Sequence, residues 1–416
     1  MAILPSDVSP ALVRLPSLLF SALFLAALGW NAILVRNEER APHMLWLFLC
    51  ACSYLLVLYG SEARGYAGLL AASAALYLVR ERILQGGVLA FILICLVGIL
   101  SHALFLLTLV GFLIWLSGMW WCKECPWKVF RNATALSCVL TLAVASPLYA
   151  NLEIGGAPRL PYLEVLGSVL TQLIGGHALS PSAPAQSVWE LFIGVAVFLA
   201  CTFELYRWPS EAGREKVLVA VMIFLPIVAV AVAKPAFILP RYFIVPVFFS
   251  YYLLAKFLVR LMRAGVIGSG VAVLGIIGFV WLNTDGIVYL SVEGRAKFAH
   301  TLGLIARSDP AASFSSNQDF QTSIRLSVPE QLSTGEERDA VALQNGNALR
   351  LRYIPMHQPP DTNSQEMPDY FIVETIDRFM PPSPSTTWNN RGNYHLIFSW
   401  RSPGESGANL ALYRRE

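Results

Sequence analysis

Residues 43–79, HMLWLFLCACSYLLVLYGSEARGYAGLLAASAALYLV, contain two apolar runs that are separated by a short charged turn. The runs 43–59 and 66–79 are rich in leucine, alanine and aromatic residues, and Glu62 and Arg64 lie between them. An ionisable pair between two membrane helices is costly to keep there, so it is a candidate functional site. A second interpretation is that Glu62 and Arg64 only cap a helix turn and extend into the membrane interface.

The composition of the chain is that of a membrane protein. Of its 416 residues, 56% are hydrophobic and only 14% are charged, whereas a soluble domain carries about 25% charged residues. The net charge of +3 is too small to indicate binding to nucleic acid. We therefore predict an α-helical polytopic membrane protein, with membrane lipids and no nucleic acid among its partners.

The apolar runs divide into about ten expected membrane spans, and several are shorter than the ~20 residues that a straight span needs. Two of the short runs meet at Ser101-His102 and form either one re-entrant hairpin or two short helices. The expected spans are 12–35, 43–59, 66–79, 87–101, 103–120, 133–150, 187–206, 217–233, 242–259 and 265–284.

Basic residues are distributed unequally between the two sets of connections. One set holds Arg36, Arg40, Arg80, Arg82, Lys123, Lys128, Arg131, Arg207, Arg214, Lys216, Arg260 and Arg263, which is twelve residues. The other set holds Arg14, Arg64, Arg159, Lys234 and Arg241, which is five. By the positive-inside rule the first set is cytoplasmic. We expect a multi-pass protein of the plasma (inner) membrane, with the amino terminus, the loop 151–186 and everything after about 285 outside.

From about Ser291 the chain becomes polar, and we predict two domains, a membrane domain 1–290 and an extracytoplasmic α/β domain 291–416. Residues 294–307 have helical periodicity, and the polar stretch 315–319 is expected to be a loop that caps an element. Strand-like runs lie at 348–354, 370–374, 394–400 and 410–414. The domain has no glycine-rich phosphate loop and no nucleophile elbow that would indicate its chemistry.

Four motifs together resemble a known family. Ser61-Glu62-Ala63-Arg64-Gly65-Tyr66, running into Leu-Tyr-Leu-Val-Arg at 76–80, is similar to the hallmark of bacterial polyprenyl-phosphate-dependent glycosyltransferases. These are GT-C membrane enzymes related to protein O-mannosyltransferases and aminoarabinose transferases. Leu12-Val13-Arg14-Leu15-Pro16-Ser17, Ser101-His102 and Leu239-Pro240-Arg241-Tyr242 also match segments of that family. The resemblance covers about 1–290.

The resemblance implies an enzyme that takes a sugar from a polyprenyl-phosphate donor on the outer face of the membrane. The acceptor is a hydroxyl or amine of a lipid, a glycan or a protein. Arg64 and Arg241 would bind the phosphate, because a planar guanidinium can hold two phosphate oxygens. Tyr66 and Tyr242 would contact sugar or lipid. Glu62 would act as a catalytic residue, orient Arg64, bind a divalent cation or hold the sugar.

Each of these roles has a simpler alternative. Arg64 and Arg241 could be interfacial arginines, and Tyr66 and Tyr242 could belong to the aromatic belt of the membrane. His102 could bind a metal ion or assist proton transfer, or it could be a histidine that is satisfied by its surroundings.

The chain departs from the family in one respect. The family's catalytic Asp, usually part of an Asp-Glu pair, lies in the first outer loop after an initial helix. The only acid before Arg14 in this sequence is Asp7, which is too close to the Arg-Leu-Pro-Ser element to match. We therefore expect that a first helix and loop are absent, either because the gene start is misplaced or because the chain is a truncated homologue that transfers the sugar poorly or not at all. The alternative function is that of a non-catalytic protein that binds or transports lipid-linked saccharides.

Overall fold

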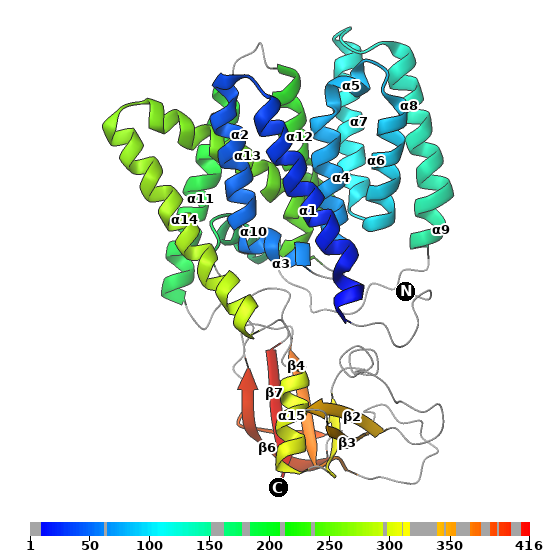
Figure 1. Ribbon diagram of the computed structural model, residues 1–416, viewed down its shortest axis with the longest axis vertical. Coiled ribbons are helices and arrows are strands. Elements are labelled where there is room, and N and C mark those ends of the chain that lie inside the picture. Colours follow the sequence, from blue (N-terminus) through cyan, green and yellow to red (C-terminus); the bar gives the residue numbers. More distant parts are fainter. Residues whose placement is uncertain are drawn as a thin grey trace. The chain divides into compact units, whose positions relative to one another are not determined.

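A computed structural model describes residues 10–61, 65–150, 162–176, 184–208, 213–233, 238–293, 298–309, 311–316, 339–344, 347–354, 367–375, 383–388, 391–400 and 409–416, and the structural statements below concern this part of the chain. The chain divides into two compact units (Figure 1). The helical unit comprises Arg14–Leu179 and Ala183–Val288. The second unit comprises Met1–Val13, Ser180–Ser182 and Tyr289–Glu416.

The helical unit consists of helices joined by short connections, as expected for segments whose backbone groups must be satisfied without water. Its helices are α1 (Pro10–Leu34), α2 (Asn37–Cys52), α3 (Tyr54–Ser61), α4 (Tyr66–Leu78), α5 (Arg80–Leu84), α6 (Val88–Ser101), α7 (Phe105–Trp121), α8 (Trp127–Leu140), η1 (Thr141–Ala145), α9 (Ser146–Tyr149), α10 (Tyr162–Leu173), α11 (Pro184–Arg207), α12 (Gly213–Ala233), η3 (Pro240–Phe243), α13 (Ile244–Arg263) and α14 (Val266–Glu293).

Six of these segments are long and apolar enough to cross a membrane, namely α1, α8–α9, α11, α12, η3–α13 and α14. The bent pair α2–α3 would make a seventh, and α4, α6 and α7 are shorter apolar helices. All ten expected runs lie in helices, with 43–59 divided between α2 and α3. The described helices therefore have the architecture of a multi-pass membrane protein.

Two helix breaks shape the end of the unit that carries the predicted site. Helices α2 and α3 meet at an angle of 61°, and the backbone N–H of Tyr54 at this break donates to Asn283 Oδ1 at 2.7 Å. Helix α6 ends at Ser101, the backbone of the next residue, His102, is extended, and α7 begins at Phe105. The break at Ser101-His102 therefore separates two short helices, as both expected arrangements, the re-entrant hairpin and the two short helices, require.

Besides the short helix α5 between two expected spans, a longer helix was not expected from the sequence. Helix α10 lies within the segment 151–186, which the hydropathy pattern assigned to an outer loop. Its sequence YLEVLGSVLTQL is too short and too polar to be identified as a span. The helix forms because Val165 packs against Ile238 and Phe243, with Tyr162 and Tyr242 at the edge of the same cluster.

The second unit is an α/β domain with α15 (Phe298–Ser308) and a sheet of seven described strands. The strands are β1 (Ser313–Ser316), β2 (Asp339–Gln344), β3 (Asn347–Tyr353), β4 (Tyr370–Thr375), β5 (Ser385–Trp388), β6 (Arg391–Trp400) and β7 (Asn409–Arg415). Their order in the sheet is β2-β3-β1-β4-β7-β6-β5, with β1 parallel to β3 and β4 and the other pairs antiparallel.

Strands β3, β4, β6 and β7 agree with the expected strand-like runs, and α15 lies within the expected helix 294–307 to within a residue. Helix α15 covers one face of the sheet, where Leu302 and Ile305 pack with Phe314 and Leu412. The expectation of a capping loop at 315–319 was wrong for Ser315 and Ser316, which belong to β1 and are fully buried. Residues 317–319 lie outside the described part.

Candidate functional site

The predicted site residues fall into two groups. Glu62 and Arg64 lie outside the described residues, so their predicted roles stay predictions. Tyr66, His102, Arg241 and Tyr242 are described, and the helices that carry them determine where they lie.

The structure brings Tyr66 and His102 together. Their ring centroids are 4.4 Å apart, and Tyr59 lies on the other side of Tyr66 at 5.0 Å. Tyr66 is only 3% exposed, so its ring packs in the bundle rather than in an aromatic belt. The Nδ1 atom of His102 accepts a hydrogen bond from the backbone N–H of Leu104 at 3.1 Å, which orients the imidazole at the α6–α7 break.

Two glycines allow this close approach of α4 to α6. A Cβ atom at Gly65 would lie 1.5 Å from the carbonyl oxygen of Ser101, and one at Gly68 would lie 2.0 Å from Ser101 Oγ. The start of α4 therefore lies directly against the end of α6. The Glu-Ala-Arg-Gly-Tyr element needs its glycine for packing, whatever its polar residues do.

Arg241 lies in the short 3₁₀ turn η3, which Pro240 begins and which leads into α13. Its side chain is half-buried, and its buried Nε atom has no hydrogen-bond partner in the described part of the chain. A buried N–H without an acceptor is unfavourable, because its desolvation is not compensated. The adjacent Tyr242 packs with the cluster of Val165 and Phe243.

Tyr66 and Arg241 lie at the same end of the bundle. Helices α4 and α13 run in the same direction (Figure 1), and Tyr77 near the end of α4 contacts Phe249 and Tyr252 of α13 at centroid distances of 5.7 Å. Tyr66 lies 11 residues before Tyr77, and Arg241 lies 11 residues before Tyr252. Along a helix this separation corresponds to about 16 Å in each case. The structure thus places Arg241 at the same level of the bundle as Tyr66, the last residue of the motif that contains Arg64.

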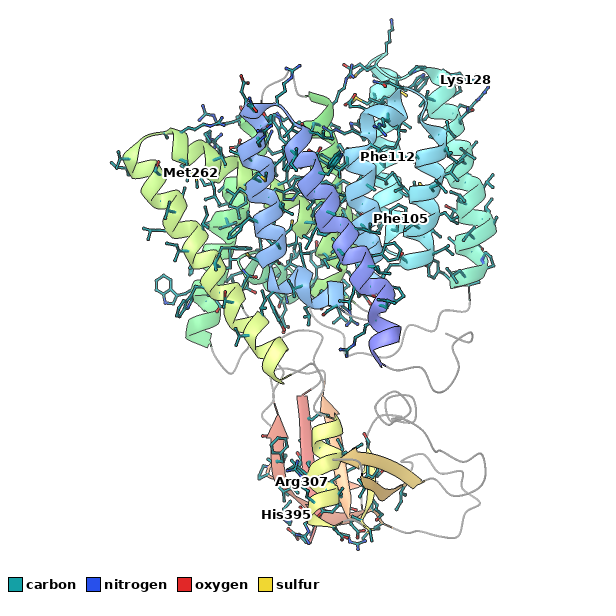
Figure 2. The ribbon with its side chains drawn as sticks, in the orientation of Figure 1. Phe105, Phe112, Lys128, Met262, Arg307 and His395 are labelled. Atoms are coloured by element: carbon teal, nitrogen blue, oxygen red, sulfur yellow. The ribbon has the colours of Figure 1, made fainter. Side chains whose placement is uncertain are left out.

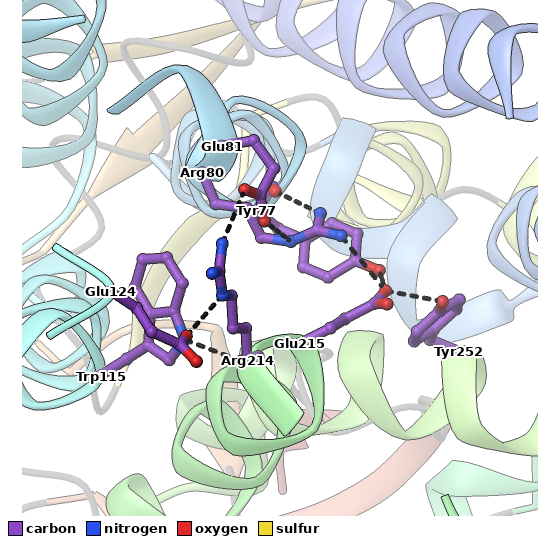
Figure 3. Close-up of polar contacts among 8 residues, drawn as sticks. All are labelled: Tyr77, Arg80, Glu81, Trp115, Glu124, Arg214, Glu215 and Tyr252. Atoms are coloured by element: carbon purple, nitrogen blue, oxygen red, sulfur yellow. Dashed lines mark hydrogen bonds and ion pairs between the residues drawn. The ribbon is translucent and has the colours of Figure 1, made fainter. Parts of the chain in front are cut away.

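The other end of the bundle contains a second polar cluster, which the sequence did not predict. We call it the Glu215 cluster; it consists of Tyr77, Arg80, Glu215 and Tyr252 (Figure 3). The hydroxyl of Tyr252 donates to Glu215 Oε1 at 2.8 Å, Tyr77 donates to the same oxygen, and Arg80 Nη2 lies 3.5 Å from it. The guanidinium of Arg80 also stacks over the ring of Tyr77 at 4.3 Å.

A second ion pair, between Arg214 and Glu81, lies beside the Glu215 cluster. Arg214 contacts Glu81 at 3.7 Å and also pairs with Glu124, while Trp115 Nε1 donates to the carbonyl oxygen of Arg214 at 2.7 Å. The dipeptides Arg80-Glu81 and Arg214-Glu215 therefore exchange partners across the bundle (Figure 3). This repeated Arg-Glu dipeptide, in two connections expected on one side of the membrane, is the sequence signal that could have revealed the cluster.

The charges of the Glu215 cluster balance one another. Burial alone would lower the pKa of Arg80, but its neighbours Tyr77 and Glu215 outweigh burial, so the pKa of Arg80 is raised and the guanidinium stays cationic. The Nε atom of Arg80, like that of Arg241, has no hydrogen-bond partner among the described residues, but the charge of Arg80 is matched by a carboxylate. A cation with such a partner does not need an exogenous anion. The Glu215 cluster is therefore suited to holding α4, α5, α12 and α13 together, whereas Arg241 at the opposite end is suited to binding an anion.

A metal site was also predicted, with His102 as a possible ligand. Within the described ranges, no group of three or more His, Cys, Asp or Glu side chains comes together in a way that could hold a metal ion. Because Glu62 is outside those ranges, a divalent cation at this end stays a prediction.

The chain matches no protein-family model, no curated protein and no solved structure. The likeness to polyprenyl-phosphate-dependent glycosyltransferases therefore rests on the motifs of the sequence.

Proposed function

We propose that the helical unit binds a polyprenyl-phosphate sugar at the end where α4 and η3 begin, and transfers the sugar to a lipid, glycan or protein acceptor. The observation that carries the proposal is Arg241, a half-buried arginine whose Nε atom lacks a partner in the described structure. A phosphate is the ligand that a planar guanidinium holds best, because two oxygens can accept from one side chain.

The transfer chemistry needs positive charge at this place. When the bond between sugar and phosphate breaks, negative charge develops on the leaving phosphate oxygen. A fixed cation in a poorly hydrated site stabilises that charge more strongly than water would. Arg241 would supply one such cation, and Arg64, which is two residues before Tyr66 in the sequence, would supply the second.

The length of α4 supports a lipid-linked donor. Its 13 residues span about 20 Å, which is about 10 Å less than the hydrocarbon thickness of a bilayer. If the Glu215 cluster lies at one membrane surface, the start of α4 lies below the other surface. A phosphate attached to a long lipid reaches that depth from within the bilayer, whereas a soluble sugar nucleotide would have to leave water.

Donor binding to the purified full chain tests the proposal. The probe is an undecaprenyl-phosphate hexose with a radiolabelled sugar, and the neutral undecaprenol is the competitor that lacks the phosphate. We expect Arg241→Gln to weaken donor binding by roughly ten- to a hundredfold, the usual range for losing a hydrogen bond to a charged group. Arg82→Gln, which removes an exposed arginine at the opposite end, should bind as the unchanged protein does.

Two results would contradict the proposal. The first is that undecaprenol displaces the labelled donor as well as undecaprenyl phosphate does, which would mean that the protein does not recognise the phosphate. The second is that the variants Arg241→Gln and Arg82→Gln bind the donor equally well. Transfer of the labelled sugar after a membrane extract is added as the source of acceptors separates the two candidate functions, because a non-catalytic binding protein would retain the donor intact.

A further inference from the structure

The connection between α7 and α8 exposes an unusual group of aromatic side chains. Trp120 lies 5.1 Å from Trp127 and stacks on Phe130 with centroids 5.2 Å apart and planes almost parallel. Beside this group Trp121 is 80% exposed. We call residues 120–131 the α7–α8 tip. Large aromatic surfaces that are left exposed at the end of a membrane helix belong at the level of the lipid headgroups.

The α7–α8 tip also carries basic residues that have no acidic partner. Lys123, Lys128 and Arg131 are exposed, and in the part of the chain that the structure describes no carboxylate lies within ion-pair distance of them. The acid of the tip, Glu124, is paired with Arg214. Figure 2 shows the Lys128 side chain pointing away from the helices at the end of α8.

Three other basic residues at this end of the bundle are paired. Arg80 contacts Glu215, Lys256 contacts Glu39 at 3.3 Å, and Arg260 contacts Glu204. The tip therefore combines cations that have no acidic partner among the described residues with a stacked, exposed aromatic group. Cations near a membrane surface attract anionic lipids with about 1 kcal/mol each.

We propose that the α7–α8 tip binds the headgroup of an anionic phospholipid in the leaflet that this end of the bundle meets. Lys128 and Arg131, one helical turn apart on α8, hold the phosphodiester, and Lys123 adds charge from the connection. The stacked rings of Trp120, Trp127 and Phe130 lie against the glycerol and upper acyl region, where amphipathic indole rings are favoured. This site is at the opposite end of the bundle from Arg241 and independent of the proposed sugar transfer.

Native mass spectrometry of the detergent-solubilised full chain tests the proposal. The protein is titrated with phosphatidylglycerol or with phosphatidylcholine of the same acyl chains, and the affinity for each bound lipid is measured. We expect a preference for phosphatidylglycerol. The double variant Lys128→Gln/Arg131→Gln should lose about thirtyfold in affinity for it, from two contributions of about 1 kcal/mol. Its affinity for phosphatidylcholine should fall by less, because the choline cation of that lipid offsets the charge of the shared phosphodiester.

The matched control is Arg36→Gln/Arg82→Gln, which removes two exposed arginines at the same end that have no aromatic group beside them. This control should keep the preference of the unchanged protein. Should the double tip variant not give a monodisperse protein, Lys128→Gln alone is expected to lose about fivefold. Equal affinity of the unchanged protein for both lipids, or an equal loss in the control, would overturn the proposal.

Discussion

Glu215 illustrates how a carboxylate is kept within an apolar helix bundle. It accepts hydrogen bonds from Tyr77 and Tyr252 and faces Arg80. The two Arg-Glu dipeptides form two ion pairs that can be compared within one protein. The pair Arg80–Glu215 is mostly buried, whereas both members of the pair Arg214–Glu81 are about half exposed. Removing one partner of a buried ion pair destabilises a folded protein much more than removing one partner of an exposed pair.

We predict that Glu215→Ala lowers the free energy of unfolding by about 3–5 kcal/mol, because the buried Arg80 keeps its charge and retains only one carboxylate contact, with Glu81 at 4.0 Å. The matched change Glu81→Ala should cost no more than about 1 kcal/mol, since its pair is exposed to solvent. Thermal unfolding of the two detergent-solubilised variants, followed by circular dichroism, gives the comparison. Equal losses would show that the Glu215 cluster does not hold the helices together.

Lys123 has the backbone conformation that usually belongs to glycine. Its φ is 62°, and the hydrogen bonds from its own N–H to Trp120 O and from Glu124 N–H to Met119 O form a Schellman motif at the end of α7. We predict that Lys123→Gly stabilises the protein by about 1 kcal/mol, because glycine has no Cβ to strain this conformation. Lys123→Ala should bring no such gain in melting temperature. A gain with both variants would instead implicate removal of the lysine charge.

At the scale of elements, the sequence predicted the helices of the bundle well and the contacts between them poorly. A long apolar run in a bilayer has few options besides a helix, so runs such as 12–35 and 217–233 were identified correctly. Helix α10 was missed because it is amphipathic and short, and its stability comes from Ile238 and Phe243, far away in sequence. Strands β1, β2 and β5 were missed for the same reason, since short strands depend on their neighbours.

The crossing of α4 and α6 depends on glycines, which gives a prediction at this scale. Gly68→Ala should separate the two helices, because its Cβ would lie 2.0 Å from Ser101 Oγ and 2.6 Å from Ser101 Cβ. We expect the free energy of unfolding to fall by about 1–3 kcal/mol, the usual cost of overpacking, and donor binding near the adjacent Tyr66–His102 contact to weaken.

Gly118→Ala is the control, because nothing lies within 4 Å of its added Cβ. It should stabilise α7 by up to about 1 kcal/mol, and a loss as large as that of Gly68→Ala would contradict the packing argument.

At the scale of the whole molecule, the contacts bring the basic connections to one end of the bundle. Arg263 donates to the carbonyl oxygen of Glu38 at 3.0 Å, and Arg214 joins the start of α12 to the connections after α4 and α7. Lys128 and Met262 lie at this same end in Figure 2. The charge count of the sequence anticipated this grouping. It did not anticipate the pairing within the group, because charge counting ignores the acids Glu81, Glu124 and Glu215.

The grouping leads to a prediction for the orientation in the membrane. Twelve basic residues in one set of connections against five in the other should hold the twelve in the cytoplasm, since basic loops resist translocation. Alkaline phosphatase, which is active only outside the cytoplasm, should therefore be active when fused after Glu416 and inactive when fused after Lys123. Green fluorescent protein at the same two positions should give the opposite pattern. Phosphatase activity at Lys123 with none at Glu416 would contradict both this orientation and a sugar transfer on the outer face, because Arg241 would then face the cytoplasmic side.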